Sequence, residues 1–174
     1  MSTPTDLEAA PQRLSEEGAI GYLRQLAQLS QDNYRTEGWA YPTQYHLLLQ
    51  HGRRFRPAPL PDHVAPMPNR QCYMNAARYA EDHPEEQLLY AEGFARMRRM
   101  DLDPTHAWCV RPDGTVLDPI WDTAPGRARV GIVLKDPTLW LLDGGGILSD
   151  MDRTLPLLGD GLPAGALALL GQPV

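Results

Sequence analysis

Three residue types that together support nucleophilic chemistry occur along this chain in the order cysteine, histidine, aspartate. Cys72 stands near the start of a segment with helical character, for which Asn69 is a plausible N-cap. The free amides and the dipole of a helix N-terminus favour the thiolate, which is the reactive form of cysteine. An unperturbed thiol, with a pKa of about 8.5, is mostly protonated at neutral pH. This position favours a nucleophilic role for Cys72, with a small buried core residue as the alternative.

His106 and Asp118 come from two segments that a short turn joins. The run Pro112-Asp113-Gly114 fits a type I turn followed by a glycine in the left-handed conformation. This arrangement makes a three-residue hairpin loop with a bulge. A two-residue loop would place a proline inside the ladder, where its missing amide is unfavourable. The sequence therefore predicts an antiparallel hairpin around this turn.

The three-residue loop fixes the register of the hairpin. It sets Trp108 opposite Asp118, and directly opposed residues share a face of the sheet. His106 lies two residues before Trp108, so it projects from the same face. His106 and Asp118 are then diagonal neighbours, about 7–8 Å apart at the backbone and within reach of a hydrogen bond. Cys109 falls on the other face with Leu117 and is expected to be a core residue.

A histidine oriented by a carboxylate is half of a cysteine-nucleophile site, because the carboxylate selects the tautomer and supports the imidazolium. The sequence therefore predicts three catalytic residues: Cys72 as nucleophile, His106 as base and Asp118 as the orienting group. Asp122 is a rival carboxylate that lies beyond the hairpin register. The expected reaction is acyl transfer, in which the thiol attacks an amide or ester carbonyl.

Further residues are candidates to complete the site. The Cys72 amide is the default oxyanion donor, and Gln71 and Asn69 are the side-chain candidates for this role. The candidate pocket residues are Trp108, Asn75 and Glu92. Each has a structural alternative. Gln71 can be an exposed first-turn residue, Asn75 can bond nearby backbone, and Glu92 can be a strand charge. Trp108 and Trp121 can be pocket walls or core.

The elements that must position these residues follow from the pattern of the chain. Residues 1–13 look like a flexible tail, and residues 14–174 form one domain. A helix opens at Ser15, with an apolar face of Leu23, Leu26 and Leu29. Other segments are assigned as follows: a short helix over 43–50, an extended connection over 56–68, a helix over 69–80, and strands over 87–97, 105–111, 115–120 and 129–134. The chain beyond Asp136 reads as short helical pieces and loops.

These residues, taken together, resemble the transglutaminase-like branch of the papain-like cysteine protease superfamily. The resemblance rests on Cys72 and Ala76, then the run from Tyr90 to Ala95 with its Gly-Phe pair, then His106-Ala107-Trp108, then Val116-Leu117-Asp118-Pro119. It covers about 69–122, roughly a third of the chain. It implies an α+β fold in which N-terminal helices precede a nucleophile helix packed on an antiparallel sheet. It also implies that Cys72, His106 and Asp118 take the three catalytic roles.

Composition limits the partners and the compartment. The chain has 174 residues, 16 Lys plus Arg and 22 Asp plus Glu, for a net charge of −6. A nucleic-acid binder normally shows a basic excess, so none is expected as a partner. The basic runs 53–56 and 96–99 are expected to be solvated surface. With two cysteines and no leader or membrane-spanning pattern, we expect a cytoplasmic protein with free thiols, no membrane partner and no cofactor.

The expected function is that of a thiol hydrolase (a peptidase, amidase or deamidase) acting on a protein or peptide. The same residues allow a protein-glutamine cross-linking acyltransferase. A non-catalytic protein-binding module that keeps the fold is a further alternative. A metal site using Cys72, His106, Cys109 and Asp118 is disfavoured, because the spacing lacks the paired ligands of zinc sites and Cys109 faces the other way.

Overall fold

The computed structural model describes residues 4–31, 36–56, 58–68, 70–96, 104–121, 128–140 and 145–174, with side chains from residue 16 onward except Gln31. The helices in these ranges are α1 (Pro4–Gln31), α2 (Gln44–His51), α3 (Cys72–Asp82) and α4 (Met151–Asp160), with 3-10 turns η1 (Pro84–Glu86) and η2 (Pro137–Leu139). The strands are β1 (Arg53–Phe55), β2 (Leu89–Ala95), β3 (Thr105–Val110), β4 (Val116–Leu117), β5 (Arg129–Leu134) and β6 (Gln172–Pro173). The expected α+β class is therefore confirmed.

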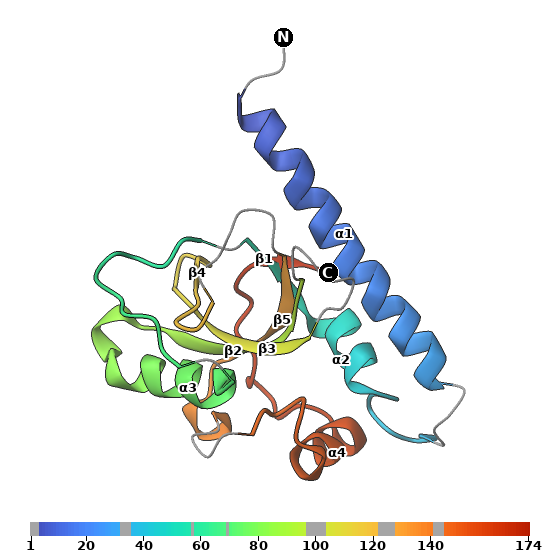
Figure 1. Cartoon of the computed structure of the whole chain (residues 1–174). Coiled ribbons are helices and arrows are strands. Elements are labelled where there is room, and N and C mark those ends of the chain that lie inside the picture. The colour runs from blue at the N-terminus through green and yellow to red at the C-terminus, as the bar shows by residue number, and fades with distance from the viewer. Residues whose placement is uncertain are drawn as a thin grey trace.

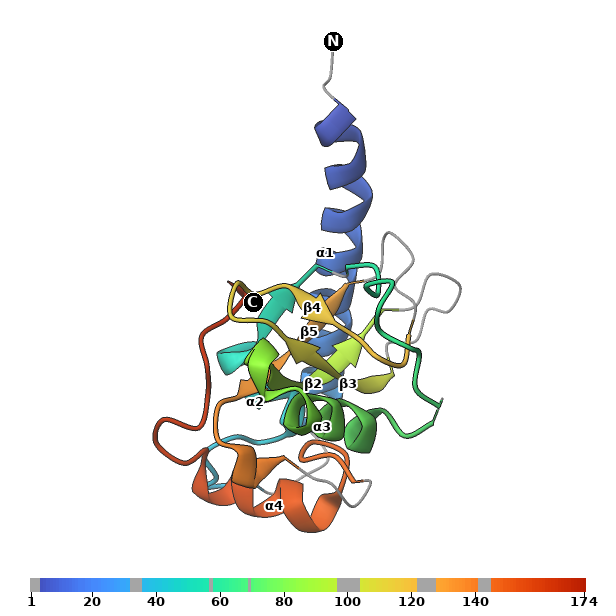
Figure 2. The same ribbon diagram turned by 90° about the vertical axis from the view of Figure 1, so that its left-hand side faces the viewer.

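The strands form one sheet in the order β4-β3-β2-β5-β1-β6, and all its described pairs are antiparallel. Helix α3 lies against one face of this sheet, along β2 and β3, while α1 and α2 pack together beside it (Figure 1). Helix α4 lies beyond α3, farther from the sheet (Figure 2). The expected packing of the Cys72 helix on an antiparallel sheet is thus present.

The sheet curls strongly toward the face opposite α3. Phe55 on β1 and Trp108 on β3 are separated by two intervening strands, yet their rings meet edge to face with centroids 5.9 Å apart. Three strand spacings in a flat sheet would separate them by about 14 Å. The face that carries Phe55 and Trp108 is therefore concave, and α3 covers the convex face.

Each face of the curled sheet has its own apolar core. On the convex side, Ala76, Ala77 and Ala80 of α3 let the helix approach the strands closely, and a larger cluster continues through α1, α2 and α4. On the concave side, a smaller cluster is built by aromatic and branched residues: Phe55, Ala91, Trp108, Val110, Val116 and Val133. The two cores leave the backbone of β2, β3 and β5 buried from both sides.

The first helix departs from the sequence expectation. It begins at Pro4 rather than at Ser15, so the segment 4–13 that reads as a tail is helical. Proline at the start of a helix costs no intrahelical hydrogen bond, and the residues after it are mostly helix formers. The buried face is formed by Ala19, Ile20, Leu23 and Ala27, while Leu29 is exposed. None of the helices in the described ranges combines the length and apolar character that crossing a membrane requires.

The strand assignments over 105–111 and 129–134 match β3 and β5 closely, and β2 is shorter than the assigned 87–97. β4 stops at Leu117, earlier than the expected 115–120, because Pro119 has no amide to continue the ladder. β1 and β6 fall in segments that were expected to be a surface run and a loop. These two strands pair at the sheet edge, and each is too short for an alternation of apolar and polar residues to be recognised in the sequence.

Two glycines let β2 and β5 approach each other closely at the centre of the sheet. Gly93 faces Gly131 across the pair, and on the other side it faces His106. A Cβ at Gly93 would overlap the Val130 carbonyl oxygen and the Gly131 Cα, and a Cβ at Gly131 would overlap the Trp108 ring. Neither glycine therefore places a side chain on the concave face next to His106, and the Trp108 ring lies against Gly131.

We expect Gly93→Ala to lower the free energy of unfolding by about 2–4 kcal/mol, because the added methyl group meets backbone that cannot move aside. Urea denaturation measures this change. Gly21→Ala is the control, since a Cβ at Gly21 in α1 meets nothing within 4 Å. That variant should gain about 0.5–1 kcal/mol from lower backbone entropy in the unfolded chain. Equal effects of the two substitutions would contradict the close approach.

Candidate active site

Helix α3 begins at Cys72, with Gln71 as its N-cap residue. The Gln71 side chain makes no capping hydrogen bond, and Asn69, the expected cap, lies outside the described residues. Arg70 has a φ of 74°, which a residue with a side chain rarely adopts, so the chain turns sharply just before the helix. The Asn75 Nδ2 donates to the Pro68 carbonyl at 2.8 Å and ties this turn to the helix. Asn75 thus helps to position Cys72 by binding the backbone that precedes the helix. This is a structural role and not that of a pocket residue.

The hairpin around Pro112-Asp113-Gly114 has the expected geometry. The Gly114 amide donates to the Arg111 carbonyl at 2.8 Å, the Arg111 amide donates to the Thr115 carbonyl at 2.9 Å, and Gly114 has a φ of 84°. Cys109 pairs with Leu117, as the register requires. The turn and the register derived from the sequence are therefore confirmed.

His106 and Asp118 are brought together on the concave face. The His106 Nε2 and the Asp118 Oδ2 are 2.8 Å apart, and both side chains are about 1% exposed. The Trp121 ring stacks on the His106 ring, with centroids 3.8 Å apart and planes 10° from parallel. The expected hydrogen bond between diagonal neighbours is therefore present.

Cys72 approaches this pair around the open edge of β3. β4 ends at Leu117, opposite Cys109. The next amide of β3 that points toward the β4 side is that of Ala107, and it therefore has no partner in β4. The Cys72 thiol lies on this side of β3, close enough to the Ala107 amide for that amide to lower the pKa of the thiol. Ala107 directly follows His106. A thiol from the helix on the convex face therefore lies at the strand edge beside a histidine of the concave face.

The electrostatics of Cys72 differ from the sequence expectation. Burial raises the pKa of the thiol, the charges of Glu92 and Asp118 raise it further, and the amides of Ala107 and Tyr73 lower it. The net direction is upward, so the first turn of α3 alone does not hold a thiolate. Desolvation wins because Cys72 is half-buried between a helix and a sheet. Ionisation of this thiol requires a proton acceptor.

Asp118 is the most heavily hydrogen-bonded group of the site. Its Oδ1 accepts from the amides of Ile120 and Trp121, each at 3.0 Å, and its Oδ2 accepts from His106 and from Nη2 of Arg129. Burial opposes ionisation, but the His106 hydrogen bond and the charges of His106 and Arg129 outweigh it and lower the Asp118 pKa to about 2. Asp118 is therefore an acceptor-only carboxylate throughout the physiological range.

Arg129 is the residue of this cluster that sequence reasoning missed. It is fully buried at the start of β5, where it forms an ion pair with Asp118. The signal in the sequence is an arginine at the head of the uninterrupted apolar run 130–134, since charged residues are rarely buried without a partner. The strand pattern gives the place of Arg129 but not its partner, which comes from another part of the chain.

The remaining candidates have structural positions. Trp108 is fully buried in the concave core, so it is no pocket wall. Cys109 lies on the convex side, donates to the Ala76 carbonyl at 3.2 Å, and has a pKa that burial raises well above its usual range. Gln71 is exposed beside Cys72, and the rival carboxylate Asp122 lies outside the described residues. Within the described ranges, no group of three or more His, Cys, Asp and Glu side chains is arranged to hold a metal ion.

Glu92 lies on the convex face of β2, directly opposite Ala107 and fully buried. Its carboxyl accepts from the amides of Ile147 and Leu148 and from the Tyr90 hydroxyl, each at 2.8 Å. The two amide bonds dock the segment before α4 onto the sheet near Cys72, while the Tyr90 bond lies within β2. Glu92 is thus an anchor for this segment and lies too deep to line an open pocket.

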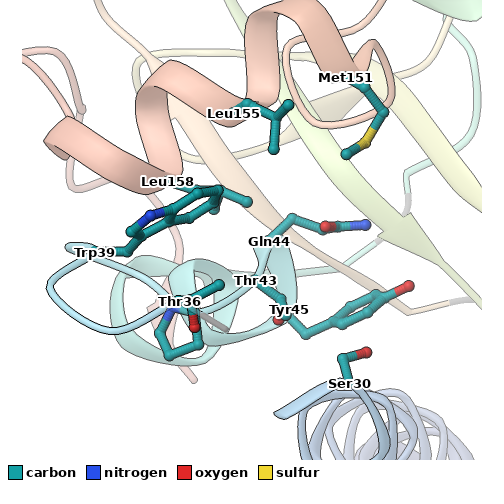
Figure 3. A pocket seen from close by; sticks show the side chains of 10 residues that line it. Ser30, Thr36, Trp39, Thr43, Gln44, Tyr45, Met151, Leu155 and Leu158 are labelled. Atoms are coloured by element: carbon teal, nitrogen blue, oxygen red, sulfur yellow. The ribbon is translucent and has the colours of Figure 1, made fainter. Parts of the chain in front are cut away.

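The two cavities that the structure shows lie away from Cys72. One, of about 220 Å³, lies between α2, α4 and the end of α1 (Figure 3), with an apolar lining of Trp39, Pro42, Tyr45, Met151, Leu155 and Leu158. A second, of about 740 Å³, lies between β1 and the hairpin turn and is lined by Arg54, Arg56 and Asp113. None of the predicted catalytic residues lines either cavity. The candidate site is therefore separate from these two cavities.

No protein-family model, curated protein or solved structure matches this chain. The chemistry of the site is therefore argued from its own residues and their geometry.

Burial of Glu92 predicts a pH-dependent stability. Desolvation raises its pKa from 4.5 to about 7, although the amides of Leu148 and Ile147 and the Tyr90 hydroxyl act in the other direction. Between these two values the folded chain keeps a proton that the unfolded chain has released. Stability should therefore fall as the pH rises through this window, by up to ~3 kcal/mol, and stay level with respect to this group above it.

Urea denaturation at pH 5 and pH 8 measures the effect. Glu92→Gln should remove most of the difference between the two pH values, while the exposed Glu85→Gln should leave it as in the wild type. A wild-type difference that survives in Glu92→Gln would show that other groups cause it.

Proposed function

We propose that this chain is a thiol enzyme of the transglutaminase-like, papain-like type, in which Cys72 is the nucleophile, His106 the base and Asp118 the residue that orients His106. One observation carries the proposal. The thiol at the start of α3 lies close enough to the Ala107 amide for that amide to lower its pKa, and Ala107 directly follows the buried His106 that is bonded to Asp118. The proximity of the thiol to the residue after His106, together with the His106–Asp118 hydrogen bond, supports the triad that the resemblance implies.

The architecture supports this assignment. The helix that begins with Cys72 packs on the convex face of a curled antiparallel sheet. His106 comes from β3, and Asp118 directly follows β4, the second strand of the hairpin. The short β4 strand opens the edge of β3 where the thiol lies. A long β4 would occupy the Ala107 amide and separate the thiol from the histidine.

The chemistry follows from the hydrogen bonds of the imidazole. With Nε2–H donated to Asp118, Nδ1 of neutral His106 carries the lone pair that accepts the Cys72 proton. The thiolate attacks the acyl carbonyl, and the imidazolium then protonates the leaving amine or alcohol to give a thioester. Water, deprotonated by His106, attacks the thioester, and the thiol receives its proton back. The Cys72 amide is positioned as an oxyanion donor, with exposed Gln71 as a side-chain candidate.

Hydrolysis of an amide in a protein or peptide is the reaction we favour. Because the thiol lies at an open strand edge of β3, an extended peptide chain suits the site. With an amine in place of water, the same thioester would give cross-linking. The acyl acceptor separates these outcomes, and the steps up to the thioester are shared.

Alkylation of Cys72 by iodoacetamide tests the proposal without a known substrate. In the wild type, general-base assistance by His106 should sustain alkylation at pH values where the thiol itself is protonated. In His106→Ala, the rate at pH 7 should fall at least about tenfold and rise with a single ionisation at or above a pKa of about 8.5. Mass spectrometry of the modified peptide assigns the reaction to Cys72.

Cys109→Ala provides the matched control, because that thiol is fully buried on the other side of β3. Its removal should leave the alkylation profile unchanged. Identical pH profiles for the wild type and His106→Ala would refute the catalytic pairing and favour a non-catalytic binding module.

A further inference from the structure

Two cationic donors converge on one oxygen of the orienting carboxylate. Asp118 Oδ2 accepts from His106 Nε2 at 2.8 Å and from Arg129 Nη2, while Asp118 Oδ1 is occupied by two backbone amides. The Arg129 side chain is fully buried. The base therefore shares its carboxylate oxygen with a guanidinium that water does not screen.

The sheet is built to let this guanidinium reach the hairpin. Arg129 is on β5, and β2 lies between β5 and the histidine strand β3. On the concave face the intervening positions are Ala95, opposite Arg129, and Gly93, opposite both Gly131 and His106. The guanidinium carbon lies 5.8 Å from the centre of the Trp108 ring. Small residues thus clear a path that a larger side chain would block.

We propose that Arg129 is a positioning residue of the active site, which holds Asp118 against His106 and, by its positive charge, limits how strongly Asp118 retains the proton on the imidazolium. The inference rests on the proposed function, because it assigns a role in tuning the base of that reaction. A lone buried carboxylate beside a histidine would stabilise the imidazolium strongly and make it a poor acid toward the leaving group. Because Arg129 binds the same carboxylate oxygen, its positive charge weakens the stabilisation of the imidazolium by Asp118.

A merely structural ion pair would give a different result. It would stabilise the fold, and its loss would lower the melting temperature without changing how His106 titrates. The distinguishing observable is therefore the midpoint of the His106 titration, followed by NMR of the imidazole signals. The Cys72→Ser chain is the parent for this measurement, because no thiol then titrates together with the imidazole. The His106→Ala chain assigns the signals among the five histidines.

Three substitutions separate the charge of Arg129 from its hydrogen bond. Arg129→Met removes both, Arg129→Gln keeps an amide donor without charge, and Arg129→Lys keeps the charge on a single ammonium group. We expect the His106 midpoint to rise by about one pH unit or more in the Met and Gln variants, a tenfold gain in proton affinity. We expect the Lys variant to stay within about 0.3 pH unit of the parent.

An unchanged midpoint in a folded Gln or Met variant overturns the proposal, as does a Lys variant that shifts as far as Gln. If neither neutral variant folds, the Lys variant decides, since a shift of a full pH unit there contradicts a role for the charge. Iodoacetamide alkylation of chains that keep Cys72 reports separately on the proposed function. Suppose that the His106 titration midpoint shifts in the Arg129 variants while the alkylation rate of Cys72 is the same with and without His106. This result would refute the proposed enzyme and leave the electrostatic coupling between Arg129 and His106 supported.

Discussion

The carboxylate of Asp118 is the group on which the organisation of this molecule depends. It directly follows the short β4 strand, accepts hydrogen bonds from the amides of Ile120 and Trp121 where the chain turns, and binds His106 and Arg129 from two other strands. Four donors offset the cost of burying one negative charge, and loss of either cationic partner would leave a buried charge poorly compensated. Because the amide of Trp121 is bound to the carboxylate while its ring stacks on His106, one residue fixes both the position and the covering of the imidazole.

The curvature of the sheet makes this convergence geometrically possible. A flat sheet would keep β5 and β3 about 10 Å apart and would spread the aromatic residues of the concave core. Close approach at Gly93 and Gly131 brings the two strands together, and Phe55 and Trp108 then meet inside the curl. The small residues therefore act at a distance from the reaction, by shaping the surface over which Arg129 extends. Packing of α3 on the other face brings Cys72 to the one strand edge that β4 leaves open.

The sequence was sufficient for the local part of this arrangement. The proline, aspartate and glycine of the hairpin turn specify its loop, the loop specifies the register, and the register places His106 and Asp118 within reach of each other. It was not sufficient for Arg129, whose partner is brought near by sheet curvature that no local pattern encodes. The protonation of Cys72 was also misjudged, because the helix N-terminus was visible in the sequence while the desolvation by the sheet was not. β1 and β6 are too short to show an alternation of their own.

A thiol that rests in its protonated form has a consequence for oxidative damage. Peroxides attack the thiolate far more readily than the thiol, so susceptibility to sulfenic acid formation follows the thiolate fraction. Cys72 is half-buried, and its pKa is raised by desolvation and by the charges of two neighbouring carboxylates. Such a cysteine stays reduced under conditions that would oxidise a permanently ionised one. In the proposed enzyme, the burial that makes the thiol depend on His106 would therefore also slow its oxidation.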